Sequence, residues 1–485
     1  MSYAIDLFID GKRVPGEGNA EFICCNPATG REIGKFREAS PAQIETAVQS
    51  AVRAQKVWAA MPAEDRGRIL RKAAELLRER NDELAQIEVE DTGKPISEAL
   101  SVDIQTGADA IEHYANLAGS IAGEYQDFGY GFYYTRREPL GVCAGLGAWN
   151  YPLQIACWKS APALAAGNAM IFKPSELTPI NAVHLAEIYC EAGMPAGVFN
   201  VLQGERNPGA ALAAHPAIEK VSLTGSAPTG RKVMEAASPR LKEVSLELGG
   251  KSPLIIFEDA DPEYAARLAM YANFLTQGEI CANGTRVFVH ASIYEDVVNE
   301  IVKRTEKLKV GAPSDPDTQI GSLISQAHLG VVSGFVSRAR EAGARVVCGG
   351  RAVSVEGHDG GAFYAPTVIV DSTDDMEHVR EEIFGPVMTV LKFENEDEVV
   401  ERANKSDYGL AGGVVTKDLV RAHRVAANIQ TGMFWINTYQ AQPMQIPFGG
   451  YKQSGIGREN GWDVLNEYTQ KKSVFVQMKP EDLPF

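Results

Sequence analysis

The sequence predicts an α/β protein with a doubly wound parallel sheet near its centre. Short apolar runs typical of buried strands lie at residues 169–172, 198–202 and 220–223, and helical segments starting near Thr178 and Pro208 separate them. Strands that alternate with helices pair in parallel through right-handed crossovers. We therefore expect ligands to bind at the carboxyl ends of these strands.

The segments before this sheet predict a hairpin and two long helices. Asp10-Gly11 supplies the turn of a hairpin over residues 7–14. Amphipathic spacing predicts helices over residues 41–59 and 63–91. Residues 130–142 alternate like a strand pair that suits a sheet edge.

A second mixed α/β region is expected to begin at Gly249-Gly250. No low-complexity linker or internal repeat separates it from the first region, so these glycines are a hinge candidate. A strand segment at 254–257, after the run SLELGG, is expected to be a fourth strand of the doubly wound sheet. The further elements predicted are helices near 262–275, 292–308 and 328–342 and strands at 285–289 and 387–393.

Composition excludes several classes of protein. The chain has 485 residues, 45% hydrophobic and 23% charged, which is typical of a globular protein with two or three domains. Its 7 cysteines are scattered without a CxxC pair or a Cys/His cluster, so we predict neither a disulfide framework nor a metal site. A net charge of -16 argues against nucleic acid and anionic membrane as partners. Without a basic and apolar leader or a long apolar run, a cytoplasmic protein is expected.

Cys281 is the strongest candidate for chemistry. It lies in the polar, glycine-rich run FLTQGEICANGTR at 274–286, whereas a structural cysteine normally has apolar neighbours, as Cys190 does. Glu247, in the run SLELGG, offers a carboxylate that can move protons or activate water. The pair favours covalent catalysis through sulfur over a structural thiol.

A phosphate-binding turn follows the strand at 220–223. The run TGSAPTG opens a helix there, so free backbone amides and the Ser226 hydroxyl can bind phosphate, although such turns also cap helices. At the preceding strand end, Lys173 and Glu176 lie where adenosine ribose hydroxyls bind in such folds. A carboxylate accepts from both hydroxyls and repels a 2'-phosphate, which favours NAD over NADP. A Walker loop is excluded because Ser245 stands where its first glycine is needed.

Seven motifs together resemble the NAD(P)-dependent aldehyde dehydrogenase superfamily. They run nearly end to end, in family order and spacing: GAWNYP (147–152), FKPSELTP (172–179), LTGSAPTG (223–230), LELGGKSP (246–253), GEICANGTR (278–286), EEIFGPV (381–387) and PFGGYKQSGIGRENG (447–461). The resemblance implies an aldehyde dehydrogenase-like fold and a homodimer or homotetramer. Its parts are a Rossmann-type NAD-binding domain (1–120 and 140–249), an α/β catalytic domain (250–465) and a small β oligomerisation extension (121–139 and 466–485).

The resemblance also implies catalytic roles. Cys281 matches the nucleophile, and its backbone amide with the side-chain amide of Asn150 matches the oxyanion hole. Glu247 matches the general base that activates water. Coenzyme-A-acylating members typically lack this glutamate, so hydrolysis to a free carboxylic acid is expected. Glu459 matches an acidic residue discussed as a proton relay; a structural carboxylate paired with Arg458 or a lysine is the alternative.

The cofactor contacts implied by the resemblance fall into two groups. Lys173 and Glu176 match contacts to the adenosine ribose, and Gly225-Ser226 match the pyrophosphate site. Trp149 lies in a cofactor-binding segment, and Glu382 and Phe384 match the pair that holds the nicotinamide ribose and ring.

The residues at the family's substrate-pocket positions indicate which aldehyde the chain oxidises. The chain looks most like the branch that oxidises 4-trimethylaminobutyraldehyde and betaine aldehyde. Tyr151, Trp158 and Phe448 match aromatic pocket positions, and aromatic faces attract quaternary ammonium; a generic apolar aldehyde pocket is the alternative. Leu275 stands where some plant betaine-aldehyde enzymes carry tryptophan, so a complete aromatic cage is not expected. We rank 4-trimethylaminobutyraldehyde first, betaine aldehyde second and aminoaldehydes third.

Two functions from other classes remain to be separated. A cysteine hydrolase or acyltransferase would share the thioester but would need no nicotinamide site. A catalytically silent structural relative would be expected to lose Cys281 or Glu247, and this chain keeps both.

Overall fold

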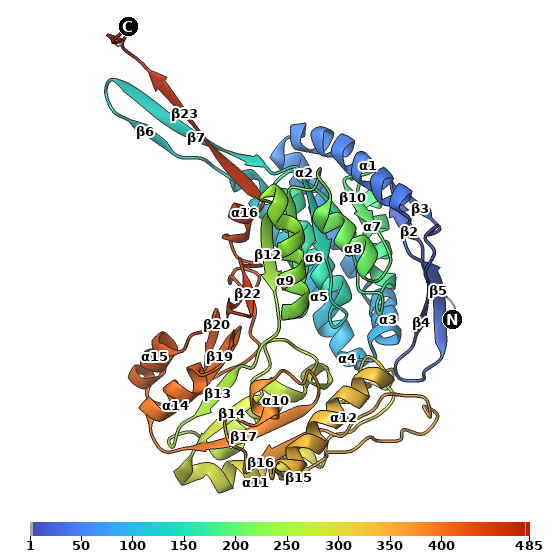
Figure 1. Cartoon of the computed structure of the whole chain (residues 1–485), viewed down its shortest axis with the longest axis vertical. Helices are drawn as coiled ribbons and strands as arrows, with labels where there is room; N and C mark the ends of the chain where they lie inside the picture. The colour runs from blue at the N-terminus through green and yellow to red at the C-terminus, as the bar shows by residue number, and fades with distance from the viewer. Residues whose placement is uncertain (1–2, 481) are drawn as a thin grey trace.

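The structure is a computed structural model that describes residues 3–480 and 482–485, and two large sheets organise it (Figure 1). The first sheet has the order β22-β12-β11-β8-β9-β10-β2-β3, and the second has the order β15-β16-β17-β14-β13-β19-β20. The central strands of both sheets pair in parallel, as in β11 with β8 and β14 with β17. The predicted α/β class is therefore confirmed.

The strands of these sheets have the following bounds. The first sheet contains β2 (Leu7–Ile9), β3 (Lys12–Val14), β8 (Val142–Leu146), β9 (Ala169–Lys173), β10 (Phe199–Val201), β11 (Lys220–Thr224), β12 (Glu243–Glu247) and β22 (Gly455–Ile456). The second contains β13 (Pro253–Ile256), β14 (Arg286–His290), β15 (Arg345–Cys348), β16 (Thr367–Val370), β17 (Val387–Phe393), β19 (Ala411–Val415) and β20 (Met433–Ile436). Smaller sheets use β1 (Tyr3–Ala4), β4 (Glu21–Cys25), β5 (Glu32–Arg37), β6 (Tyr125–Asp127), β7 (Gly131–Pro139), β18 (Tyr408–Gly409), β21 (Tyr451–Lys452) and β23 (Thr469–Gln477).

Helices cover the faces of the sheets. Those before Gly249 are α1 (Pro41–Ala60), α2 (Ala63–Glu79), α3 (Asn81–Thr92), α4 (Ile96–Glu98), α5 (Ile104–Leu117), α6 (Pro152–Ala165), α7 (Ile180–Glu191), α8 (Arg206–Ala214) and α9 (Ala227–Ala237). Those after it are α10 (Pro262–Phe274), α11 (Tyr294–Thr305), α12 (Gln326–Glu341), α13 (Glu377–Arg380), α14 (Glu396–Asn404), α15 (Leu419–Asn428) and α16 (Val464–Glu467). Among the described residues no helix combines the length and apolar character needed to cross a bilayer.

The N-terminal predictions are confirmed except at one helix. Asp10 and Gly11 have φ values of 53° and 78°, as the tight turn between β2 and β3 requires. Helix α1 begins with a capping box in which Ser40 and Gln43 bond each other's backbone amides. The single helix predicted over 63–91 is wrong, because the backbone leaves helical geometry at Arg80 and separates α2 from α3. The apolar spacing continues across this break, so periodicity could not reveal it.

Predictions for the first sheet are right for three strands and incomplete for the rest. The runs at 169–172, 198–202 and 220–223 are β9, β10 and β11. The run at 254–257 is β13, which lies in the second sheet instead. Strands β8 and β12 were missed; β8 reads VCAGL, and its glycine and alanine carry little strand propensity.

The segment 130–142 is not a strand pair within one sheet edge. Strand β7 pairs with β6 on one side and with β23 on the other, from Thr469 opposite Pro139 to Gln477 opposite Gly131. This three-stranded sheet projects from the body of the protein (Figure 1). Exposed aromatics line it, and the Phe128 and Phe475 rings lie 6.3 Å apart. Its role in oligomerisation, like the domain boundaries, stays a prediction.

The second region agrees closely with the sequence. Strands β14 and β17 and helices α10, α11 and α12 occupy the predicted segments, with ends displaced by at most three residues. The chain passes from the first sheet to the second between β12 and β13 through Gly249 and Gly250. A side chain at Gly250 would place its Cβ 2.6 Å from the carbonyl oxygen of Cys281, so glycine is needed where this junction touches the cysteine loop.

Candidate active site

A cavity of about 250 Å³ lies at the carboxyl ends of strands in the first sheet. Glu247 ends β12, Thr224 ends β11, and Asn150 follows β8, while Cys281 enters from the loop before β14. The cavity brings together eight residues singled out in the sequence: Asn150, Tyr151, Trp158, Glu247, Leu275, Cys281, Phe448 and Glu459. The candidate catalytic residues therefore lie at the carboxyl ends of the strands, where this sheet topology predicts a ligand site.

Cys281 lines the cavity and is partly exposed. Burial raises its pKa well above the ordinary range, and the nearby carboxyls of Glu382 and Glu247 add to the shift. Such a thiol is unreactive until a base removes its proton or a nearby positive charge stabilises the thiolate.

Glu247 is a buried carboxyl whose two oxygens have no hydrogen-bond partner among the described residues. Burial raises its pKa well above the ordinary range, and the charge of Glu459 raises it further against the opposing effect of Lys159. A raised pKa makes the carboxylate a stronger base once it loses its proton. Buried polar atoms without partners are rare and often mark sites of chemistry.

Asn150 is held at both ends, and its side chain is only 7% exposed. Its side-chain nitrogen donates to the carbonyl oxygen of Glu279 at 2.9 Å, and its own carbonyl accepts from Lys94 at 2.7 Å. A primary amide carries two N–H donors, so one remains beyond the bond to Glu279. That donor can stabilise negative charge developing on an oxygen in the cavity.

Glu459 lines the same cavity and forms a buried ion pair with Lys159. Lys159 also donates to the Ser222 hydroxyl at 3.0 Å. The structural alternative, a carboxylate paired with a lysine, is therefore present in the fold. Because Glu459 also raises the pKa of Glu247, the ion pair still acts on the cavity electrostatically.

The predicted adenosine-side residues follow β9 and β11. Lys173 is buried and pairs with Glu176 at 3.5 Å; burial lowers the lysine pKa, and the glutamate opposes this. Gly225 leads into Ser226, the N-cap of α9, whose side chain makes no capping bond to the helix. Pro228 has no N–H, so Ala227 and Thr229 are the residues of this first turn that can offer an amide to an anion.

The predicted nicotinamide-side residues gather near the cysteine loop. Glu382 accepts from the Gly250 amide at 3.0 Å, and burial raises its pKa to about 7. Phe384 has a φ of 58° and meets Trp149 edge to face, with ring centroids 5.1 Å apart. His328, which the sequence did not indicate, donates from Nε2 to the Phe384 carbonyl at 2.6 Å and fixes this strained residue.

The aromatic positions form one wall of the cavity. The Trp158 and Phe448 rings lie 6.0 Å apart with an interplanar angle of 67°, and the indole nitrogen has no partner in the described structure. Tyr151 shares a 2.6 Å hydrogen bond with Thr276, next to Leu275. Residues missed by the sequence analysis also line the cavity: Tyr271, Gln440, Gln442 and Met444. Tyr271 lies one helical turn before Leu275, so helical spacing could have revealed it.

No group of His, Cys, Asp or Glu residues suited to a metal ion occurs in the part of the chain that the structure describes.

Comparisons with known proteins cover almost the whole chain. The sequence model of the Aldehyde dehydrogenase family matches residues 14–474. Two curated proteins named Betaine aldehyde dehydrogenase, from Vibrio vulnificus strains CMCP6 and YJ016, are each 55% identical over 479 residues, which is 99% of this chain and 99% of theirs.

Solved structures agree with the fold. The NAD+ complex of an aldehyde dehydrogenase from Bacillus cereus superposes with a TM-score of 0.96 at 41% identity, covering 98% of this chain and 97% of that one. A putative aldehyde dehydrogenase from Burkholderia cenocepacia gives a TM-score of 0.97 at 39% identity, covering 99% and 98%. A point mutant of betaine aldehyde dehydrogenase from Staphylococcus aureus, in complex with NAD+ and with a BME-modified cysteine, gives 0.96 at 36% identity, covering 99% and 98%.

Proposed function

Because this chain belongs to the aldehyde dehydrogenase family and oxidises aldehydes with NAD, we propose that its substrate is betaine aldehyde and its product glycine betaine. The observation that carries this proposal is the 55% identity, over 99% of both chains, to proteins named Betaine aldehyde dehydrogenase. The sequence alone ranked 4-trimethylaminobutyraldehyde first. The relatives favour the second-ranked substrate instead, so that order is revised.

The cavity is suited to a trimethylammonium group. Such a cation has no hydrogen to donate, so aromatic faces recognise it better than carbonyl or hydroxyl groups do. Trp158 and Phe448 lie edge to face at the cavity wall, with Tyr151 and Tyr271 also lining it. A volume of about 250 Å³ suits a small aldehyde.

The residues present fit NAD. The uncapped amides of α9 suit a pyrophosphate, and Thr224, at the end of β11, has a buried hydroxyl oxygen without a partner among the described residues. Lys173, Glu176 and Ser226 would hold the adenosine side, and Trp149, Glu382 and Phe384 the nicotinamide side. When bound, NAD supplies the hydride acceptor of the reaction.

In the first half of the proposed reaction, Cys281 is the nucleophile. Its thiol loses a proton to Glu247, and the sulfur forms a bond to the aldehyde carbon while the carbonyl oxygen becomes an alkoxide. The free N–H of Asn150 and the Cys281 backbone N–H donate to this oxygen. Departure of the aldehyde hydrogen as hydride restores the carbonyl and leaves a thioester on Cys281.

In the second half, Glu247 acts on water. It first passes the proton taken from Cys281 to solvent, and its carboxylate then takes a proton from a water molecule, whose oxygen attacks the thioester carbon. The C–S bond breaks, the sulfur leaves as a thiolate that takes this proton from Glu247, and the acid departs. The unpartnered oxygens and raised pKa of Glu247 support this role. The buried pair of Glu459 with Lys159 would tune the base rather than contact substrate.

The substrate proposal is tested by comparing aldehydes that differ only in charge. The neutral isostere of betaine aldehyde is 3,3-dimethylbutanal, in which carbon replaces the quaternary nitrogen; 4-trimethylaminobutyraldehyde tests the longer cation. We expect kcat/KM for NADH formation to be about 10-fold or more higher for betaine aldehyde than for the isostere, in line with a desolvated cation–π interaction. Equal values would remove the cation-binding claim, and a higher value for the longer cation would restore the original ranking.

A further inference from the structure

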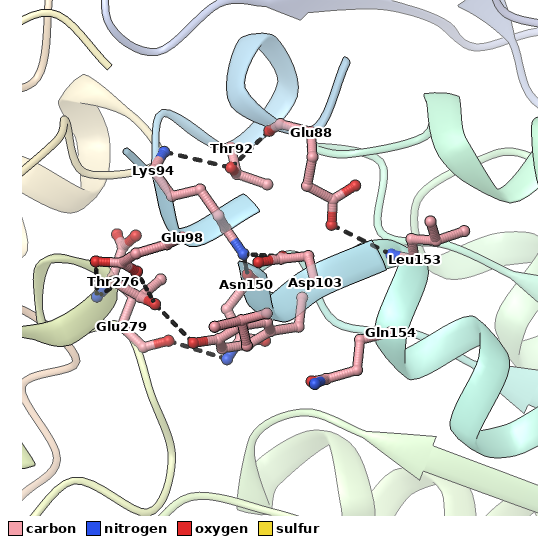
Figure 2. A network of polar contacts seen from close by, with 12 residues as sticks. Glu88, Thr92, Lys94, Glu98, Asp103, Asn150, Leu153, Gln154, Thr276 and Glu279 are labelled. Carbon is pink, nitrogen blue, oxygen red and sulfur yellow. Dashed lines mark hydrogen bonds and ion pairs between the residues drawn. The ribbon is translucent and has the colours of Figure 1, made fainter. Parts of the chain in front are cut away.

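A buried lysine lies directly behind the candidate active site. Lys94 is 0% exposed and is not among the residues that line the cavity. Figure 2 shows its side chain reaching between Asp103 and Asn150. It forms an ion pair with Asp103, and its ammonium donates to the Asn150 carbonyl at 2.7 Å. The ammonium also lies 3.9 Å from the centroid of the Tyr151 ring.

Burying a charge is costly unless its surroundings compensate for it. Lys94 has one carboxylate, one carbonyl and one aromatic face as partners, so its charge is compensated without water. Burial raises the pKa of Glu88 well above its ordinary range, and the charge of Asp103 contributes next. Burial also raises the pKa of Asp103, although Lys94 opposes this effect. The Lys94 ammonium is therefore balanced by Asp103.

The local backbone explains why Lys94 points inward. Helix α3 ends at Gly93, whose φ of 80° turns the chain. The Thr92 hydroxyl then accepts from the Lys94 amide at 3.3 Å and donates to the Glu88 carbonyl at 2.6 Å. Asp103 ends a π-helical segment, Ala99–Asp103, a conformation that is often found at functional sites.

The same stretch of chain reaches a second wall of the cavity through Glu98. Glu98 accepts from the Thr276 amide at 2.9 Å and from its hydroxyl at 2.7 Å. Thr276 and Gln277 have φ values of 48° and 42°, so these bonds hold a strained turn beside Leu275. A hydroxyl has one hydrogen, which Thr276 gives to Glu98; Tyr151 therefore donates in their 2.6 Å bond.

From this geometry we propose that Lys94 is a positioning residue, which fixes the amide donor of Asn150 and the ring of Tyr151 from behind the cavity. Asn150 is bonded through its carbonyl to Lys94 and through its side chain to Glu279, so its remaining N–H has little freedom to turn away (Figure 2). Lys94 acts through these two residues and touches no reacting atom. A donor displaced by about an ångström loses much of its effect on the transition state.

The test uses single turnovers with enzyme and NAD in excess over aldehyde. Lys94→Met keeps the length of the side chain and removes its charge. We expect NADH to form about 100-fold more slowly, approaching the loss caused by removing an oxyanion donor, with the amplitude and the Kd for NAD unchanged. Lys94→Arg, which retains the cation, should recover part of the rate. A wild-type rate in Lys94→Met would overturn the proposal.

A matched control separates positioning from folding. Lys220 is also buried, pairs with a carboxylate, Glu467, and lies 5.0 Å from the centroid of the Tyr468 ring, away from the cavity. Lys220→Met should lower Tm as Lys94→Met does, because each removes a buried ammonium that is paired with a carboxylate, yet its single-turnover rate should stay within about threefold of wild type. Equal slowing in both variants would also overturn the proposal.

A double-mutant cycle tests whether Lys94 acts through Asn150. If it does, adding Lys94→Met to Asn150→Ala should slow the single turnover no further. Multiplying losses would contradict the proposal. The inference rests on the proposed role of Asn150 and not on the substrate: the cycle uses whichever aldehyde the wild type oxidises fastest, so failure with betaine aldehyde would appear in the wild type alone.

Discussion

Two groups of polar residues near Asn150 differ in how their atoms are bonded: one contacts Asn150 from behind the cavity, and the other lines the cavity with it. In the Lys94 cluster (Lys94, Glu98, Asp103 and Thr276), Lys94 has two polar partners and Glu98 accepts from both donors of Thr276. In the reactive pair (Cys281 and Glu247), both carboxyl oxygens of Glu247 lack a partner among the described residues.

This difference distinguishes the residues that position others, the Lys94 cluster, from those that react, the reactive pair. An unpaired buried polar group costs about 1–3 kcal/mol, so it persists where some other demand keeps it. A base must have a free oxygen to take a proton, whereas a positioning group is held by its bonds. Both oxygens of Glu247 are without a partner, which marks the reactive side, whereas in the Lys94 cluster Asp103 Oδ2 alone lacks a partner among the described residues.

The largest effect is expected at the sulfur of the reactive pair. Cys281→Ala removes the nucleophile, so NADH formation from aldehyde should fall by about 10⁴-fold or more. Cys348→Ala, in β15 of the second sheet, is the control and should retain activity. Retained NAD binding, measured by titration, would show that Cys281→Ala is folded; retained aldehyde oxidation would refute the covalent mechanism.

The next effect separates the two halves of the reaction. In Glu247→Gln, steady-state turnover should fall by about 100- to 10,000-fold, because water loses its base. Because the proposed reaction also uses Glu247 to deprotonate Cys281, rapid mixing should show a slowed burst of up to one NADH per subunit. A burst at the wild-type rate would assign the thiol proton to another base, and full turnover would contradict the hydrolytic role of Glu247.

The sequence predicted the reactive pair better than its support. Cys281, Glu247 and Asn150 lie in runs whose polar or glycine-rich character stands out, and the structure brings all three to one cavity. Lys94 was missed because its partner Asn150 is 56 residues away, and a single lysine before a proline resembles a solvated loop. His328 was missed for the same reason, since its bond to Phe384 spans 56 residues.

Prediction of the strands likewise succeeded where the signal is local in the sequence and failed where it depends on distant contacts. Strand β17, which is rich in branched residues, was predicted with its bounds, because an apolar run indicates burial, whereas β16, which reads TVIV, was not predicted. Strand β8 was missed because contacts with neighbouring elements, rather than strand propensity, require its residues to be small. A side chain at Gly145, for example, would place its Cβ 2.9 Å from the Phe172 ring. Tertiary contacts of this kind leave no local signature.

The smallest effect is expected at Glu98 in the Lys94 cluster, as a change in the free energy of unfolding with pH. Burial raises the pKa of Glu98 from its ordinary 4.5 to about 7, while hydrogen bonds from Thr276 act against the shift. The folded protein thus keeps this proton between pH 4.5 and about 7, where the unfolded chain loses it. The resulting stability is complete below pH 4.5 and is lost as pH rises towards 7, by on the order of 3 kcal/mol.

Glu98→Gln has no such proton, so its free energy of unfolding should fall less steeply than that of the wild type between pH 5 and about 7. Taking the difference between the two proteins at each pH cancels the other buried carboxyls, such as Asp91, whose pKa burial also raises to about 7. Turnover should change only a few-fold, because glutamine can still accept from Thr276. If the free energies of unfolding of the two proteins change with pH in parallel, the Glu98 proton is not retained on folding. If Glu98→Gln loses as much turnover as Glu247→Gln, the Lys94 cluster is not distinct in function from the reactive pair.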